Sequence, residues 1–583
     1  MKKKVKFAIA AAWIGAMLTA CVPGAVPGAV PEAIHTNDPA VSAGKLPFDP
    51  PVTITTAKAL RDNDKLQFGD TPANNPITRW AKEKLGIIQT YKWIVTDQND
   101  ALVNKIRLAL ASREELPDVL FLTQHEIPEL LPELAASGQI MSVEQAFEQY
   151  APKRVKEAYA RNPEVWRTVT LEGKRWGLPH ISEATLGDPI LWIRQDWLDR
   201  LKLKAPATLD ELELVLDAFT NDDPDGNGLR DTVGIAVAGS NTLNGWMGDV
   251  SFLFGAYGEQ PYQWNRSSDG SLAYGSIQPE VGQALDKLRD WYDRGYVDPD
   301  FGTRDEQQAA ELFVSGGAGV ISGPGWMGGW PLSEANLPEG AIRPIPYPDG
   351  PDGKMSRVGT RQSYGSYFFR QGFDRMDAVF AYWDAVYGVY LEDPDSDFRH
   401  GFGEGYDYII ENGQAQYDFP GVNSTVSNYL LFAPGSPADV LPEGSLESRV
   451  FQGYRRTPYE QKLAATSSRL YLEGRLIAEQ QQELSRSEQF DGPQTDTMRQ
   501  KWPLLQKLEK ETFLKVAYGK ASPEAALREF RERWLAYGGD QITKEVNDWD
   551  RMVSGAPAGL GSGAADAGEL AADAIENANE ASE

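Results

Sequence analysis

Apolar residues follow two alternating spacings from about Pro51 onward. The segments VTITTA, IIQTYKWIV and PDVLFL have the short, β-branched and apolar character of strands. Between them, NPITRWAKEKLG and ALVNKIRLALAS repeat apolar residues at helical spacing. Strands separated by helices of ten or more residues indicate βαβ units and a parallel sheet. The alternation resumes after residue 188, so the sequence predicts an α/β fold with two lobes.

Two segments are candidates for crossings between the lobes. GKRWGLP, at residues 173–179, precedes the strand ILWIR, and IRPIPYP, at residues 342–348, is stiffened by proline. These crossings divide the chain into an N-terminal lobe at 52–182, a second lobe at 183–342, a return to the first lobe at 343–392, and C-terminal helices at 393–552 that complete the second lobe. A few residues at each crossing can act as a hinge, with a ligand cleft between the lobes.

A helix followed by an acidic loop stands out in the second lobe. Thr208 is placed as its N-cap, Glu211 completes a capping box, and Leu212, Leu216 and Phe219 repeat at helical spacing. The next segment, TVGIAV, alternates like a strand. The pattern is therefore helix, loop and strand, which disfavours a sensor that moves two helices.

The acidic loop has the spacing of a calcium loop. Its candidate ligands fall at positions 1, 3, 5, 7 and 9, and they are Asp223, Asp225, Asn227, the carbonyl of Leu229, and Asp231. Gly228 stands at the sharp turn, Thr232 adds a possible oxygen, and Gly234 replaces the bidentate glutamate of position 12. We expect a structural Ca²⁺ site of reduced affinity. The alternative is an Asx-rich turn without an ion.

The N-terminus has the pattern of an export signal. Residues 1–20 combine a basic head with an apolar run too short to span a bilayer, and they end directly before Cys21, the single cysteine. A chance cysteine at an ordinary cleavage site is the alternative to lipidation. Residues 21–51 are rich in proline and alanine and predict an extended tether. Residues 553–583 predict a disordered acidic tail.

Charge and aromatic content narrow the ligand class. The formal net charge of −27 disfavours nucleic acid and anionic lipid as partners. The chain has 16 Trp and 23 Tyr, and several lie in glycine-rich loops. Flat aromatic side chains with a few polar groups suit the apolar faces and polar rims of sugars. The candidates for ligand contact are Trp246, Trp264, Trp326, Trp330 and Tyr364, and for each of them a core position is the alternative.

These motifs, taken together, resemble the family 1 extracellular solute-binding lipoproteins. The resemblance rests on the LTAC lipobox, WIRQDWLDRLKLKAPATLDEL, DPDGNGLRDT, FVSGGAGVISGPGW, GEGYDY and the C-terminal AYGKASPEAALREFRERWLAYGGDQITKEVNDWDRM. It implies a type II periplasmic-binding-protein fold, calcium at the acidic loop, and sugar stacking on Trp326. It also implies a lipid anchor at Cys21 on the extracellular face of the cell membrane, ABC permease partners, and a monomer.

The resemblance implies a binding protein for oligosaccharides that performs no chemistry. Two alternatives stay open: a surface-anchored polysaccharide-degrading enzyme, and a peptide- or lipid-binding lipoprotein of the same fold. The 84 acidic residues could supply a carboxylate pair anywhere, but the chain contains no HExxH, GxSxG or P-loop motif.

Overall fold

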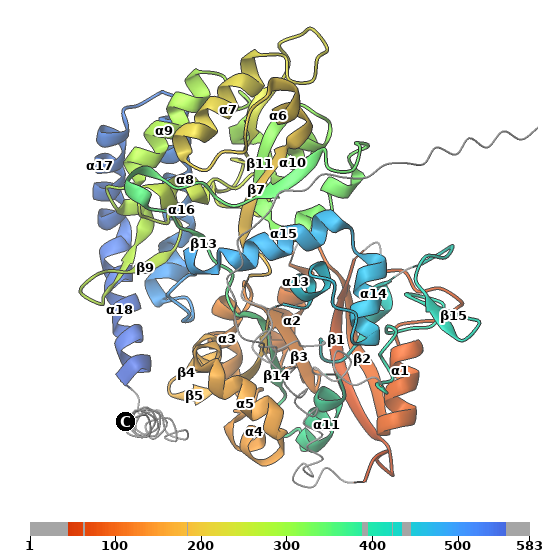
Figure 1. Ribbon diagram of the computed structural model, residues 1–583. Coiled ribbons are helices and arrows are strands. Elements are labelled where there is room, and N and C mark those ends of the chain that lie inside the picture. The colour runs from red at the N-terminus through yellow and green to blue at the C-terminus, as the bar shows by residue number, and fades with distance from the viewer. Residues whose placement is uncertain are drawn as a thin grey trace, which may run out of the picture. The chain divides into compact units, whose positions relative to one another are not determined.

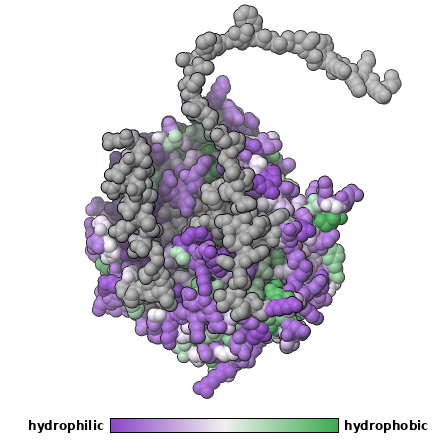
Figure 2. Space-filling model, turned by 60° about the horizontal axis from the view of Figure 1, so that its bottom comes forward, coloured by the Kyte–Doolittle hydropathy of each residue, from purple (hydrophilic) through white to green (hydrophobic). Residues whose placement is uncertain are grey.

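The computed structural model describes residues 45–61, 64–98, 100–182, 185–386, 395–422, 424–433 and 445–555. The export signal, Cys21, most of the tether and the acidic tail from residue 556 onward therefore lie outside the described residues. Within the described part, no helix is long and apolar enough to cross a membrane. Figure 2 shows a face on which the described residues are mainly hydrophilic, with small separate hydrophobic patches.

The N-terminal lobe is built on a five-stranded sheet with the order β2-β1-β3-β14-β6 (Figure 1). Strands β1 (Val52–Leu60), β2 (Ile87–Thr96) and β3 (Val119–Thr123) pair in parallel, which confirms the prediction for the start of the chain. Strand β14 (Ser363–Phe369) runs antiparallel to both β3 and β6 (Gly177–Ile181). Its direction is reversed because the chain enters β14 from the other lobe, so the sheet is mixed.

Helices cover this sheet and bury their apolar faces against it. One core contains Phe48, Ile54, Leu122, Trp383 and Phe432, so it joins the segment before residue 182 to the segment after residue 366. The helices of this lobe are α1 (Pro76–Trp80), π-helix η1 (Ala81–Leu85), α2 (Ala101–Ser112), α3 (Ile127–Ser137), α4 (Glu144–Tyr150), α5 (Lys153–Arg161), 3₁₀ helix η2 (Pro163–Val169), α11 (Met376–Val386), 3₁₀ helix η8 (Ser424–Tyr429), α13 (Leu446–Phe451) and α14 (Pro458–Thr466). The small hairpins are β4 (Thr170–Leu171) with β5 (Lys174–Arg175), and β15 (Ile409–Glu411) with β16 (Gln414–Gln416).

The C-terminal lobe has a four-stranded sheet with the order β12-β7-β11-β8. Strand β7 (Pro189–Arg194) is antiparallel to β12 (Ile342–Ile345) and to β11 (Ala318–Pro324), whereas β8 (Val233–Ala236) is parallel to β11. Its main helices are α6 (Gln195–Leu201), α7 (Leu209–Asn221), α8 (Ser251–Ala256), α9 (Val281–Asp293), α10 (Glu306–Val314), α15 (Arg469–Gln480), α16 (Asp496–Ala517), α17 (Pro523–Trp534), π-helix η11 (Leu535–Gly539) and α18 (Asp540–Gly555).

Short elements complete this lobe. They are the hairpin of β9 (Trp264–Arg266) with β10 (Leu272–Tyr274), and the 3₁₀ helices η3 (Gly275–Ile277), η4 (Phe301–Thr303), η5 (Gly325–Gly328), η6 (Leu332–Glu334), η7 (Pro351–Gly353) and η10 (Gln482–Leu484). Strands β13 (Arg357–Val358) and β17 (Ser485–Arg486) pair with each other in parallel. Thr208 caps α7 as predicted, but Glu211 accepts from the backbone N–H of Ala207, so the capping box is only half formed.

The crossings between the lobes differ from the prediction in three ways. GKRWGLP contributes β5 and β6 and stays in the N-terminal lobe, so the first crossing comes after β6 and before β7. IRPIPYP forms β12 of the second sheet, and the chain returns through β13 into β14. Residues 395–432 pack in the N-terminal core, so the second lobe is completed from α15, not from residue 393. Local pattern could not reveal these assignments, because they depend on non-local packing.

A buried ion pair ties the crossing segments together. Asp188 of the first crossing and Arg357 of β13 approach to 3.1 Å, and both side chains are fully buried. The Oδ1 atom of Asp188 accepts from the backbone of Thr360 at 2.6 Å, and Ser485 of β17 donates to Oδ2. Arg357 also donates to the carbonyl of Pro189 at 3.0 Å. The first crossing, the returning strand β13 and its neighbour β17 are therefore held at one hydrogen-bonded point.

Candidate functional site

Two tryptophans project from the strand ends of the C-terminal lobe. Trp246 follows β8 and is 62% exposed, and Trp326 lies on η5, directly after β11. Because β8 and β11 are parallel, their carboxyl ends share one edge of the sheet. The two indole rings meet edge to face with centroids 6.1 Å apart. The segments around these two tryptophans pack closely at Gly323, where a Cβ atom would lie only 2.2 Å from Sδ of Met327.

A tyrosine occupies the corresponding edge of the N-terminal lobe. Tyr364 is 48% exposed and lies parallel to Phe121, with centroids 6.3 Å apart. Its carbonyl accepts from the backbone of Gln124, so the end of β3 and the start of β14 meet there. Burial and the positive charge of Arg361 lower the pKa of the neighbouring His125, which favours a neutral imidazole. The crossings join this edge to the edge that carries Trp246 and Trp326.

The other two aromatic candidates have different environments. Trp330 is 45% exposed and follows η5, close to the start of α15, where Gly329 approaches Tyr471. Trp264 is only 2% exposed and packs against Tyr274 with centroids 5.4 Å apart. The prediction of ligand contact for Trp264 is therefore wrong, because its side chain belongs to the core beneath α16 and α17. An aromatic residue in a polar segment gives no local sign of its burial.

A cavity of about 320 Å³ lies between segments of both lobes, and we call it the hinge chamber. It is lined by η2 residues, by the start of the segment that enters β14, and by the segment after β17: Glu164, Val165, Arg167, Thr168, Thr360, Arg361, Gln362, Ser363, Ser487, Glu488, Gln489 and Asp491. Burial raises the pKa of Glu488 to about 7 despite the attraction of Arg361. No local pattern could predict this chamber, because its three walls come from segments that lie far apart in the chain.

An ionic cluster beside the hinge chamber connects the lobes. Arg167 of η2 approaches Asp550 of α18 to 2.7 Å, and Arg266 holds the same carboxylate with contacts of 3.0 Å. The pKa of the Asp550 carboxyl is lowered, mainly by the hydrogen bonds from Arg266 and also by the one from Arg167. Arg167 also lies over the Trp549 ring, 5.1 Å from its centroid. The C-terminal helix is thus fastened to the N-terminal lobe by charge and by ring stacking.

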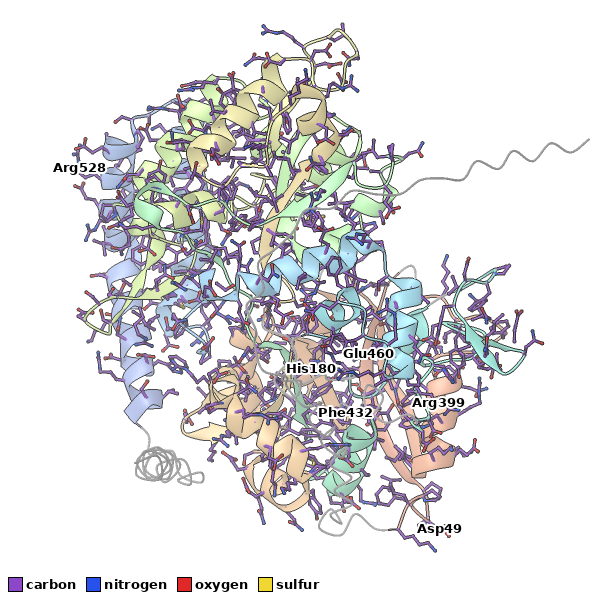
Figure 3. The ribbon with its side chains drawn as sticks, viewed as in Figure 1. Asp49, His180, Arg399, Phe432, Glu460 and Arg528 are labelled. Carbon is purple, nitrogen blue, oxygen red and sulfur yellow. The ribbon has the colours of Figure 1, made fainter. Side chains whose placement is uncertain are left out.

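A second cavity between the lobes, also of about 320 Å³, lies between α2, α3 and α16. The backbone of Gln494 donates to the carbonyl of Pro128 at 2.9 Å, which connects the two lobes there. Arg107 in its wall is already paired with Glu129 and Glu133 at 3.2 and 3.0 Å. Figure 3 labels His180 and Phe432 in the interior of the N-terminal lobe and Asp49 at its margin.

The predicted calcium loop keeps its oxygen-rich interior in the structure. Asp223 Oδ2 accepts from the backbone of Gly228, while its Oδ1 is buried without a hydrogen-bond partner in the described part of the chain. Asn227 Nδ2 donates to Asp225 at 2.8 Å and to both carboxylate oxygens of Asp231 at 3.2 Å. The amide nitrogen of Asn227 thus lies between the carboxylates of Asp225 and Asp231.

Two positions that follow the predicted ligands have structural roles. Thr232 is buried and donates its hydroxyl to the carbonyl of Phe219, so its oxygen is engaged in holding the end of α7. Gly234 packs against Leu216, where a Cβ atom would lie 2.9 Å from the leucine side chain. Among the described residues, no three His, Cys, Asp or Glu side chains gather closely enough to hold a metal. The carboxylates of the loop would have to draw together around an ion.

A family comparison identifies this arrangement. A sequence model of bacterial extracellular solute-binding proteins matches residues 70–386, which is more than half of the chain. The chain belongs to that family. In this solute-binding protein the match covers the four-stranded sheet and all strands of the five-stranded sheet except β1. The structure confirms the two-lobed α/β fold predicted from the sequence.

Individual relatives match shorter parts of the chain. The polygalacturonan/rhamnogalacturonan-binding protein YtcQ of Bacillus subtilis is 36% identical over 157 residues, covering 27% of this chain and 30% of the relative. The lipoprotein LipO of the same organism is 32% identical over 194 residues, covering 32% of this chain and 37% of the relative. The chain thus aligns with about a third of the length of these curated relatives.

A solved structure extends the likeness of the fold. The Streptococcus pneumoniae ABC-transporter substrate-binding protein FusA, as an EF-hand mutant in complex with fructo-nystose, superposes with a TM-score of 0.58. The superposition covers 86% of this chain and all of FusA, at 18% sequence identity. At that identity, the likeness establishes the two-lobed architecture of this solute-binding protein.

Proposed function

We propose that this solute-binding protein captures an oligosaccharide between its lobes, leaves it chemically unchanged and delivers it to an ABC importer. The observation that carries the proposal is the set of accessible rings on the two sheet edges that the crossings join: Trp246 and Tyr364 are exposed, and Trp326 is half-buried beside Trp246. Flat rings pack on the C–H faces of sugars, and clefts between lobes bury most of a ligand. YtcQ and FusA are named for such ligands, which supports the same class here.

Replacing Trp326 by alanine should weaken oligosaccharide binding about thirtyfold, because losing one packed aromatic anchor costs on the order of 2 kcal/mol. Calorimetry against plant and microbial oligosaccharides measures the affinity, and solution scattering with and without ligand measures closure of the lobes. Tyr537→Ala, on η11 at the other end of the lobe, is the matched control and should bind as the wild type does.

Two outcomes would replace the proposal. Release of shorter sugars by the purified protein would favour the polysaccharide-degrading enzyme. Binding of peptides or lipids by a protein that takes up no oligosaccharide would favour the other class of cargo. Tight oligosaccharide binding by Trp326→Ala would keep the function but move the contact to Trp246, Trp330 or Tyr364.

We propose a structural Ca²⁺ at Asp223, Asp225, Asn227, Asp231 and the carbonyl of Leu229. The buried, unpartnered Oδ1 of Asp223 supports it, as do the carboxylates that converge on Asn227. Turning the Asn227 amide by 180° would present its oxygen to the ion in place of the nitrogen. The ion would then pin the connection between α7 and β8 at the surface of the lobe.

Chelation should lower the melting temperature of the wild-type protein. An ion at a hundred times its Kd stabilises the folded state by about 2.7 kcal/mol. Asp225→Ala should remove the difference between calcium and EDTA, whereas Asp222→Ala, outside the predicted ligand set, should keep it. A melting curve of the wild type that is the same in both buffers would refute the site.

We propose that the protein is lipid-anchored through Cys21 on the extracellular face of the cell membrane. The lipobox pattern and the family's extracellular members support this location. LipO is itself named a lipoprotein. Cys21→Ala should appear in the medium, whereas the wild type should fractionate with membranes. Retention of the variant in the membrane fraction would place the anchor elsewhere in the chain.

A further inference from the structure

The charged side chains of the hinge chamber leave hydrogen-bonding capacity open. Arg167 Nε lies 3.8 Å from Asp491 Oδ2, and Arg361 Nε lies 3.7 Å from Asp491 Oδ1. Both distances exceed a hydrogen bond. Arg167 Nε is also buried without a partner among the described residues. Donors and acceptors therefore alternate along the wall, with room between them for a bridging group.

Charge in the hinge chamber is balanced without a spare cation. Its lining contains two guanidinium groups, Arg167 and Arg361, and three carboxyl groups, Glu164, Glu488 and Asp491. Glu488 lies 3.9 Å from Arg361. The next carboxylate outward, Asp550, is shared between Arg167 and Arg266. Each cation that reaches the chamber already faces an anion, so a carboxylate entering it would meet no unneutralised positive charge.

We propose that the hinge chamber is a sugar subsite that binds the hydroxyl-bearing edge of an uncharged sugar unit and discriminates against uronates. This inference rests on the proposed capture of an oligosaccharide. A hydroxyl group both donates and accepts, so neighbouring hydroxyls can donate to Asp491 and accept from the two arginines. Gln362, Gln489 and Thr168 add neutral partners of both kinds. Oxidation of the sugar to a uronate would bring its carboxylate against Asp491 and Glu488.

The test uses matched oligosaccharides that differ only in oxidation at C6, such as galactan with galacturonan and glucan with glucuronan oligomers, each pair having the same linkage and anomeric configuration. Calorimetry on the wild-type protein should find the neutral member of a binding pair at least tenfold tighter, the scale expected for one unfavourable charge contact near a protein surface. Asp491→Asn keeps the size of the side chain but removes its charge. This variant should bind the neutral sugar about tenfold more weakly than the wild type does. The difference in affinity between the neutral sugar and the uronate should become smaller.

A second variant reverses the charge argument. Gln362→Lys adds a cation to the wall, and it should strengthen binding of the uronate while leaving the neutral sugar nearly unchanged. Asp548→Asn is the matched control, because Asp548 lies on α18, pairs with Arg551 and does not line the chamber. Thermal melts identify any variant that fails to fold.

The outcomes separate this inference from the proposed function. Tighter binding of uronates by the wild type, or a difference within the pair that neither Asp491→Asn nor Gln362→Lys alters, would overturn the subsite and leave oligosaccharide capture intact. Failure of the wild type to bind either member of any pair would overturn the proposed function, and the subsite with it.

Discussion

Arg357→Met should lower the free energy of unfolding by about 3 to 5 kcal/mol, because it leaves the carboxylate of Asp188 buried without its cation. Both side chains are fully buried, and Arg357 also bonds to Ser485 and to the carbonyls of Pro189 and Ala478. Urea unfolding followed by tryptophan fluorescence measures the change.

Arg343→Met is the matched control for that prediction. Arg343 lies on β12 and faces Glu473 at 3.5 Å, but its side chain is 53% exposed. Exposed pairs contribute about 0 to 1 kcal/mol, so this variant should unfold close to the wild type. An unfolding midpoint for Arg357→Met that matches the midpoint of Arg343→Met would show that the buried pair does not hold the crossings.

Trp264→Ala should destabilise the protein by about 3 to 5 kcal/mol, the usual cost of truncating a buried aromatic side chain. Its ring packs between Tyr274 and Trp534, with centroids 5.4 and 6.3 Å away, and truncation leaves a cavity under α17. Circular dichroism in urea gives the loss. Trp246→Ala is the comparison, since its ring is exposed and its loss should change stability by less than about 1 kcal/mol.

The same pair of variants separates packing from binding. Trp246→Ala should lower oligosaccharide affinity, whereas Trp264→Ala, measured where it is still folded, should bind normally. Normal stability of Trp264→Ala together with lost binding would restore Trp264 to the ligand site and contradict the burial described above.

Sequence periodicity predicted the elements of the N-terminal lobe well, because each depends on nearby residues. The strands at 52–60 and 87–96 and the helix at 101–112 form where alternating and helical spacings placed them. Such patterns survive in the fold because one face of each element is buried.

The division into lobes was predicted less well, because it depends on pairing between distant segments. The segment IRPIPYP at residues 342–348 has the pattern of a strand and forms β12. Only its pairing with β7 shows that it belongs to the sheet of the C-terminal lobe. Residues 398–432 supply aromatic side chains to the N-terminal core, and nothing in their local pattern names that partner. The burial of Trp264 and the presence of the hinge chamber also could not be predicted, because both depend on contacts between distant segments. Spacing did suffice for the acidic loop, since its residues are neighbours in the chain.

The position of β14 has a consequence for the order in which the protein can fold. Strand β3 ends at Thr123, and its neighbour β14 begins only at Ser363. All four strands of the C-terminal lobe's sheet lie between them in the chain. The N-terminal sheet cannot join β3 to β6 until β14 is available, because β14 is the strand that pairs with both. Synthesis must therefore pass Phe369 before the five-stranded sheet can be completed.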